Sequence, residues 1–271
     1  MVIFPAGVPG RGVSTRSDGQ ALLEAAMRVA EEISSAFVGK RGIVGIVYLG
    51  GLARGYFDVH SDVDIVVYKR RGARIGWPRE KEYEYGGFAV DLEVRDYERD
   101  LYRRWSFEER WVFLHALVRY DPQGLVRRLF ELKVPLSESE RRRLLEEELA
   151  KARWSLSDVD AWLHRGDPLS AHFVAITSLK HFLRALAVYN GIPPPPDKWL
   201  LHAVSSLEEK PPQLIQLAQD VLVAPSLAEL ERKKAALREL ESWLLAHSSS
   251  QPSRSSSPSQ SSSEVQAASH S

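Results

Sequence analysis

The chain has 271 residues, of which 44% are hydrophobic and 27% charged, and its 36 Lys and Arg equal its 36 Asp and Glu. This composition predicts a globular protein with a sizeable core, and the balanced charge argues against an extended surface for nucleic acid or anionic membranes. The absence of cysteine excludes disulfides and thiolate metal sites. No apolar run reaches the roughly 20 residues of a membrane helix, and no secretory signal opens the chain, so we expect a soluble, cytoplasmic protein.

The first half of the sequence predicts a small unit of mixed strands and helices. A Gly- and Pro-rich stretch, 1–18, is expected to form a flexible arm. Apolar residues then recur every three or four positions over 20–37, which is typical of a helix. The elements expected next are a buried strand (42–49), a short helix (52–57), a strand (63–68), a polar connector and a further strand (88–94).

The second half of the sequence predicts helices. Ser137 and Glu140 have the spacing of a capping box, which opens a long helix through residue 166. The other elements expected are a helical segment (101–118), an extended stretch with a turn and a short helix (119–132), and further helices (168–191, 197–207, 226–247). The serine-rich stretch 248–271 is expected to be a disordered tail.

These patterns predict an α+β fold with two domains. The first, 19–134, combines a small mixed sheet with helices and is expected to carry the chemistry. The second, 135–247, is expected to be an α-helical bundle that closes over the substrates.

Four carboxylates stand out on the predicted strands. Asp62 and Asp64 share one face because side chains alternate along a strand, and Asp91 and Glu93 share a face of a later strand. Carboxylates this close repel one another unless a divalent cation neutralises them, and hard oxygen ligands suit Mg²⁺ bound together with substrate phosphates. We therefore predict a metal site at Asp62, Asp64 and a third carboxylate, which is Asp91 or, as the alternative, Glu93.

A glycine pair precedes these aspartates. Gly50 and Gly51 end the strand over 42–49 and open the short helix, so their backbone amides can hold phosphate oxygens. A metal-bound triphosphate is then the expected ligand. Two cations held there would stabilise both the entering and the leaving oxygen of an in-line displacement at phosphorus.

Lys198 is the candidate phosphate ligand in the helical half. Asp197 is expected to cap its helix, which places Lys198 in the first turn, where the helix dipole disfavours a cation unless an anion lies nearby. A solvated lysine is the alternative. Lys180 is a second candidate for a phosphate contact, whereas Trp199 is expected in the core.

The motif as a whole resembles a known family. A strand ending in Gly50-Gly51, ten intervening residues, Asp62-Val63-Asp64 and a later acidic strand are similar to the polymerase-β-like nucleotidyltransferase superfamily. The resemblance implies that the glycines hold nucleotide phosphates, that the first two aspartates bind two Mg²⁺ ions, and that Asp91 completes the metal site. Many members carry serine at the position of the second glycine, so phosphate binding here would depend on backbone amides.

A second segment resembles one branch of that superfamily. The stretch 187–204, AVYNGIPPPPDKWLLHAV, is similar to the aminoglycoside (kanamycin-type) nucleotidyltransferases, in which a helical C-terminal domain packs against the catalytic sheet. The expected activity is Mg²⁺-dependent transfer of a nucleoside monophosphate, with AMP from ATP as first choice among NTPs, to a hydroxyl of a small molecule or protein, with release of pyrophosphate. The alternatives are a toxin–antitoxin-type protein adenylyltransferase and a non-catalytic nucleotide-binding regulatory module. Membrane and nucleic-acid partners are not expected, and the oligomeric state is open.

Overall fold

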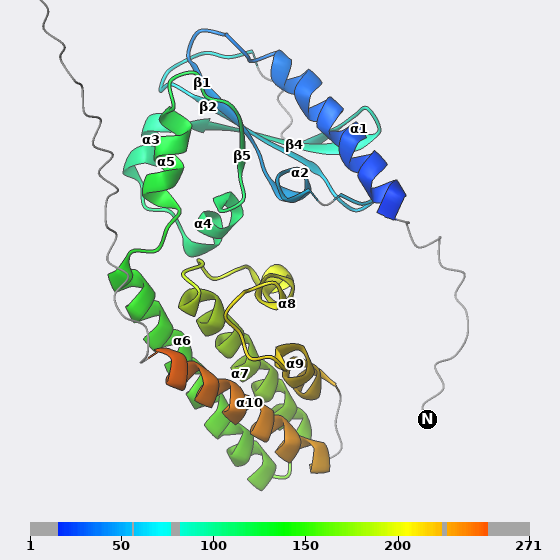
Figure 1. The fold of residues 1–271 in the computed structure, drawn as a ribbon, viewed down its shortest axis with the longest axis vertical. Helices are drawn as coiled ribbons and strands as arrows, with labels where there is room; N and C mark the ends of the chain where they lie inside the picture. The colour runs from blue at the N-terminus through cyan, green and yellow to red at the C-terminus, as the bar shows by residue number, and fades with distance from the viewer. Residues whose placement is uncertain (1–15, 56, 77–81, 224–226, 249–271) are drawn as a thin grey trace, which may run out of the picture.

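A computed structural model describes residues 16–55, 57–76, 82–223 and 227–248. The helices of this part are α1 (Arg16–Ser35), α2 (Gly50–Arg54), α3 (Tyr97–Tyr102), α4 (Phe107–Phe113), α5 (Leu125–Lys133), α6 (Glu138–His164), α7 (Pro168–Tyr189), α8 (Asp197–Ser205), α9 (Leu214–Leu222) and α10 (Leu227–Ser248). The strands are β1 (Ile43–Tyr48), β2 (Val63–Lys69), β3 (Glu82–Tyr85), β4 (Phe88–Asp96) and β5 (Leu117–Tyr120). This mixed sheet followed by helices confirms the expected α+β fold (Figure 1).

The strands form one mixed sheet in the order β3-β4-β2-β1-β5. The strands β2 and β4 run parallel, and the other neighbouring pairs run antiparallel. The hairpin between β3 and β4 turns on Gly86 and Gly87, whose positive φ angles of 59° and 83° suit a two-residue turn. The parallel pair is what matters for the site, because its register sets Asp64 directly beside Asp91.

Helices cover both faces of this sheet (Figure 1). On one face Ile65 and Val67 are buried in a core that includes Ala30 of α1. On the other face Val66 and Tyr68 are buried in a second core, to which α4 and α5 also contribute. Successive side chains of β2 are therefore buried on opposite faces, because this strand lies at the centre of a sheet that is covered on both sides.

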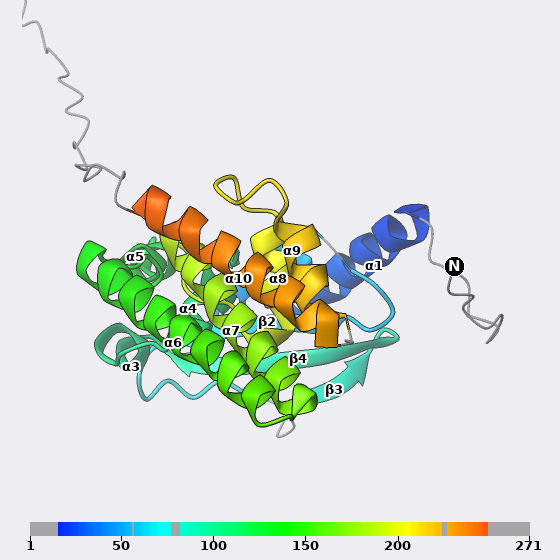
Figure 2. The same ribbon diagram turned by 90° about the horizontal axis from the view of Figure 1, so that it is seen from below.

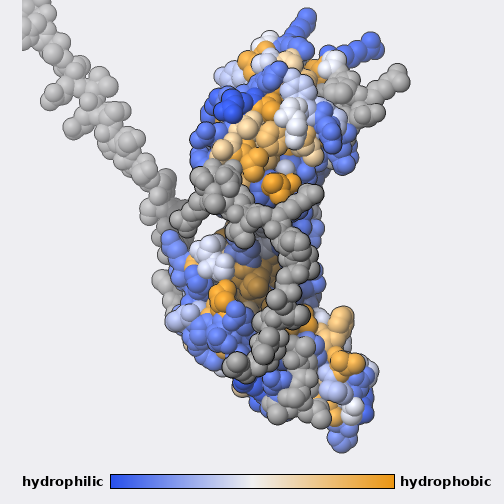
Figure 3. All heavy atoms as spheres, turned by 90° about the vertical axis from the view of Figure 1, so that its right-hand side faces the viewer, coloured by the Kyte–Doolittle hydropathy of each residue, from blue (hydrophilic) through white to orange (hydrophobic). Residues whose placement is uncertain are grey.

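The helical half has a core of its own, formed by buried residues between 149 and 244. The antiparallel helices α6 and α7 lie side by side, and α10 lies against α7 (Figures 1 and 2). Ser137 and Glu140 form the expected capping box at the start of α6, and Asn190 and Gly191 end α7 as expected. On the face drawn in Figure 3, groups of hydrophobic residues (orange) are surrounded by hydrophilic residues (blue) in both halves of the molecule.

Several elements differ from the sequence-based expectation. The short helix begins at Gly50 rather than residue 52, and it ends at Arg54, where Gly55 forms the C-cap with a left-handed φ of 68°. The single helix expected over 101–118 is instead the end of α3, then α4 and β5, because the Ser106 side chain caps a new helix by accepting a hydrogen bond from the Glu109 amide. The strand β3 and the helix α9 were not predicted.

The two expected terminal segments lie largely outside the described residues. The first helix begins at Arg16, inside the arm expected over 1–18, and α10 includes Ser248, the first residue of the expected tail. The division into domains at 134/135 stays a prediction. None of the helices in the described residues is both long and apolar enough to cross a membrane.

Candidate functional site

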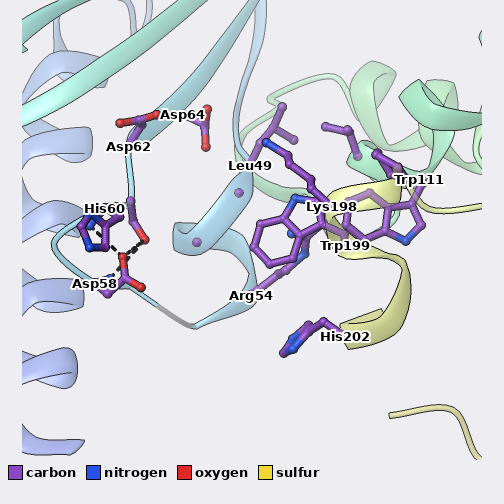
Figure 4. A pocket seen from close by; sticks show the side chains of 15 residues that line it. Leu49, Arg54, Asp58, His60, Asp62, Asp64, Trp111, Lys198, Trp199 and His202 are labelled. Atoms are coloured by element: carbon purple, nitrogen blue, oxygen red, sulfur yellow. Dashed lines mark hydrogen bonds between the residues drawn. The ribbon is translucent and has the colours of Figure 1, made fainter. Parts of the chain in front are cut away.

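A cavity of about 510 Å³ opens between the sheet and the helical half. Its walls come from the residue that follows β1, from α2, from the segment that leads into β2 and the start of that strand, from α4, and from α8 with the residue before it (Figure 4). The carboxylates of Asp62 and Asp64 lie on one side of α2, and Lys198, Trp199 and Arg54 lie on the other. The lining residues are Leu49, Gly50, Gly51, Arg54, Asp58, His60, Ser61, Asp62, Asp64, Trp111, Val112, Pro196, Lys198, Trp199 and His202.

The structure brings three of the predicted carboxylates together. Asp62 immediately precedes β2, Asp64 is its second residue, and Asp91 is the register partner of Asp64 on β4. Asp62 and Asp64 line the cavity, whereas Asp91 is not among its lining residues. Burial and then the charges of Asp91 and Asp62 raise the pKa of Asp64 from 3.8 to about 6, against the opposing effect of Lys198. The carboxylates therefore repel one another in the absence of a cation.

Gly50 is required by the position of Asp64. Its φ of 55° is left-handed, and a Cβ atom built on it would lie only 2.0 Å from Asp64 Oδ2. Only glycine allows the backbone and the carboxylate to approach this closely. Gly51 lines the cavity beside it. Gly50 thus makes room for the carboxylate of Asp64, a role that the sequence motif alone did not indicate.

Arg54 is a site residue that the sequence analysis missed. Its guanidinium carbon lies 4.2 Å from the ring centre of Trp111 and 5.2 Å from that of Trp199. Among the described residues no carboxylate forms an ion pair with Arg54, so its N–H donors are available to the cavity. Burial lowers the pKa of Arg54, and the charge of Asp64 opposes this effect. The signal in the sequence was an arginine at the end of the short helix that the glycines open.

Trp199 corrects one expectation. It was expected in the core, but it is only partly buried and lines the cavity. Its ring centre is 6.3 Å from that of Trp111, and the two planes are tilted by 30°. His202, one turn further along α8, faces the ring of Trp199 edge-on at 5.9 Å. The helix α8 therefore presents an aromatic surface to the site.

Lys198 lies in the first turn of α8, as expected, and its exposed side chain lines the cavity. The cap of this helix is Pro196 rather than Asp197. Asp197 instead binds Lys180 at 3.0 Å and Arg184 at 3.7 Å. The structure therefore separates the two lysine candidates, because Lys198 faces the site and Lys180 is engaged in an ion pair.

Glu93 lies in different surroundings from Asp91. Its carboxylate accepts a hydrogen bond from Arg95 at 2.9 Å, and Arg95 also binds Glu109 and Asp100. It lines a separate cavity of about 270 Å³ in which ion pairs predominate. Sharing a strand face with Asp91 thus does not bring Glu93 to the cavity that Asp62 and Asp64 line.

The donor chemistry of the site fits magnesium without forming a closed cage. Among the described residues no three or more histidine or carboxylate side chains converge as a ready-made metal centre. Mg²⁺ characteristically uses one or two protein carboxylates and completes its shell with water and phosphate oxygens. Asp62 and Asp64 open to the cavity and supply such a pair. The raised pKa of Asp64 shows that its ionised form is disfavoured by burial and by the neighbouring carboxylates. A bound cation would offset this effect.

Comparisons with known proteins add little to this geometry. No protein-family model matches the chain, and no curated protein matches it either. Among solved structures, a nucleotidyltransferase-like protein from Exiguobacterium sibiricum 255-15 is similar to this chain at 17% identity and a TM-score of 0.45, covering 81% of this chain and 74% of that one. At this degree of similarity the neighbour does not decide the function, and the aminoglycoside branch stays a prediction.

Proposed function

We propose that the protein is a Mg²⁺-dependent nucleotidyltransferase that transfers a nucleoside monophosphate, with AMP from ATP as first choice, to a hydroxyl group. One observation carries this proposal: a single cavity presents Asp62 and Asp64 on one side and the cations Arg54 and Lys198 on the other. The carboxylates suit metal ions, and the two cations suit the phosphates that such ions accompany. A cavity with carboxylates alone would suit only the metal ions, and a cavity with cations alone would suit only the phosphates.

The three carboxylates would have different roles in the reaction. Asp62 and Asp64 would hold Mg²⁺, which when bound neutralises phosphate charge and polarises the α-phosphoryl group. Asp91, beside Asp64 in the register of the sheet, would contribute to a second metal position and accept the proton of the attacking hydroxyl. The acceptor oxygen forms a bond to the α-phosphorus while the bond to the β-phosphate oxygen breaks, and pyrophosphate leaves.

The cations would act on the triphosphate. The two indole rings restrict the rotamers of the Arg54 side chain, so less side-chain entropy is lost when it binds an anion. Lys198 lies close enough to Asp64 to lower the pKa of that carboxyl group. The Lys198 ammonium group would therefore be within electrostatic reach of a phosphate that accompanies a metal ion at Asp64. Both side chains would offset the negative charge that develops on the leaving pyrophosphate.

The roles of Asp91 and Glu93 can be separated with two isosteric substitutions. Asp91→Asn should leave metal-dependent ATP binding largely intact and lower turnover by a factor on the order of 100 or more, the scale of a lost general base. Glu93→Gln is the matched control, because it lies on the same strand face but pairs with Arg95. Binding is measured by calorimetry with and without EDTA, and turnover by pyrophosphate release.

The opposite result would reassign the third carboxylate. If Glu93→Gln abolishes turnover while Asp91→Asn is nearly normal, Glu93 is the residue that acts. If ATP binds equally tightly in EDTA, the proposed metal dependence is wrong.

A further inference from the structure

A second cavity adjoins the first and is not explained by nucleotide binding. It has a volume of about 350 Å³ and lies between the end of α4, the turn after α7, and α8. The two cavities share Trp111 as a common wall. Its lining residues are Trp111, His115, Ala187, Asn190, Ile192, Pro195, Ala203, Val204, Ser206, Leu207 and Glu208.

The lining is apolar over most of its extent, and two of its polar side chains are already engaged in hydrogen bonds. The Asn190 amide donates hydrogen bonds to the carbonyls of Leu186, at 2.9 Å, and Glu209, at 2.8 Å. The Ser206 hydroxyl donates to the Ala203 carbonyl at 2.9 Å. A ligand would therefore meet mainly hydrocarbon on these walls, which favours an apolar body.

Glu208 is the one acidic side chain among the described residues that line this cavity. Among the described residues that line it there is no lysine or arginine. Burial lowers the pKa of His115, and the nearby charge of Arg54 lowers it further, so this imidazole adds no positive charge at neutral pH. The exposed carboxylate of Glu208 forms no ion pair with another described residue. A cationic group on the ligand would complement this carboxylate, whereas a phosphate or carboxylate would be repelled.

We propose that this second cavity is the acceptor subsite and that it takes a small hydroxyl compound with an apolar body and a single amine. The inference rests on the proposed nucleotidyl transfer, because it identifies the molecule that receives the nucleotide. It also departs from the aminoglycoside expectation. A polyamino sugar would set several ammonium groups against Ala187, Val204 and Leu207, where they would lose hydration without gaining partners. A nucleic-acid acceptor would meet no cation in this cavity.

Three probes with one carbon frame test the proposal on the full-length protein without nucleotide. They are 2-amino-1-phenylethanol, which is cationic, 1-phenylethane-1,2-diol, which is neutral, and mandelate, which is anionic. We expect calorimetry to give a dissociation constant on the order of 1 mM for the amine. The diol should bind roughly fivefold more weakly than the amine, and mandelate more weakly than the diol. Equal binding of amine and mandelate, or binding of none of the three, would overturn the proposal.

Two variants and one control locate the binding. Glu208→Gln should remove the preference for the amine over the diol, while Glu209→Gln, the same charge change one residue outside the lining, should keep it. Ala203→Phe should fill the cavity and weaken the binding of the amine and of the diol, while metal-dependent ATP binding persists. An unchanged preference in Glu208→Gln, or unchanged binding of the probes in Ala203→Phe, would place them elsewhere.

A transfer assay then tests the acceptor role. With Mg²⁺ and α-labelled ATP, label should pass to 2-amino-1-phenylethanol faster than to kanamycin, and the reverse order would overturn the assignment. Failure of the proposed function can be told apart from failure of the acceptor assignment, because in the first case the wild-type protein would show no metal-dependent ATP binding.

Discussion

Replacing Asp64 by asparagine should stabilise the metal-free protein at alkaline pH, although it removes a proposed ligand. Burial, Asp91 and Asp62 raise the pKa of Asp64 from 3.8 to about 6 in the folded chain. A raised pKa means that folding disfavours the ionised form, so the penalty is small below pH 3.8 and is complete once the pH has risen through 6. The difference between the two pKa values corresponds to about 3 kcal/mol. The Asp64→Asn side chain cannot ionise and should escape this penalty.

The assay is thermal and urea unfolding of both proteins in EDTA at pH 8 and pH 5. At pH 8 the variant should gain about 3 kcal/mol, or roughly 5–10 °C in Tm, and at pH 5 the gain should fall to about half. Asp158→Asn on α6, outside both cavities, is the control for removing one carboxylate elsewhere in the chain. A variant that is no more stable than the wild type at pH 8, or equally stabilised at both pH values, would refute the claim that burial and the neighbouring carboxylates disfavour the ionised form of Asp64.

Two further predictions follow from the geometry of the first cavity. Gly50→Ala should cost about 1–3 kcal/mol more than Gly55→Ala in urea unfolding, because both residues have positive φ but only Gly50 would direct a Cβ onto Asp64; equal costs would contradict the close approach. Lys198→Ala should weaken ATP binding in calorimetry by roughly fivefold. Lys180→Ala should not weaken it, because the ammonium group of Lys180 already forms an ion pair with Asp197 of α8. If both lysine variants bind ATP like the wild type, Lys198 is a solvated side chain.

Local sequence rules indicated the carboxylates but left the third one open between Asp91 and Glu93. Alternation along a strand placed Asp62 and Asp64 on one face, and the register of two parallel strands brings Asp91 beside Asp64. The glycine pair was also visible, because two glycines between an apolar strand and a helix favour a close approach of the backbone to another group. These features depend on residues within one motif of about 40 positions, for which spacing and periodicity carry enough information.

The other side of the cavity could not be derived in the same way. Arg54, Trp111 and Trp199 come from three helices that are far apart in the sequence, and their contact depends on how the helical half meets the sheet. No local pattern indicates such a contact. The edge strand β3 was missed for a different reason: it is only four residues long and largely exposed, and its alternating Glu and Tyr residues lie in a stretch that was interpreted as a polar connector.

The central claim is that the cavity supports transfer of a nucleotide rather than of a terminal phosphate. The most direct measurement compares ATP labelled at the α-phosphate with ATP labelled at the γ-phosphate, in the presence of Mg²⁺ and a hydroxyl acceptor. We expect the α-label to appear on the acceptor and the γ-label in pyrophosphate, and we expect both signals to disappear in Asp62→Asn and in EDTA. Transfer of the γ-label to the acceptor, or transfer of the α-label that survives Asp62→Asn, would contradict this assignment of the site.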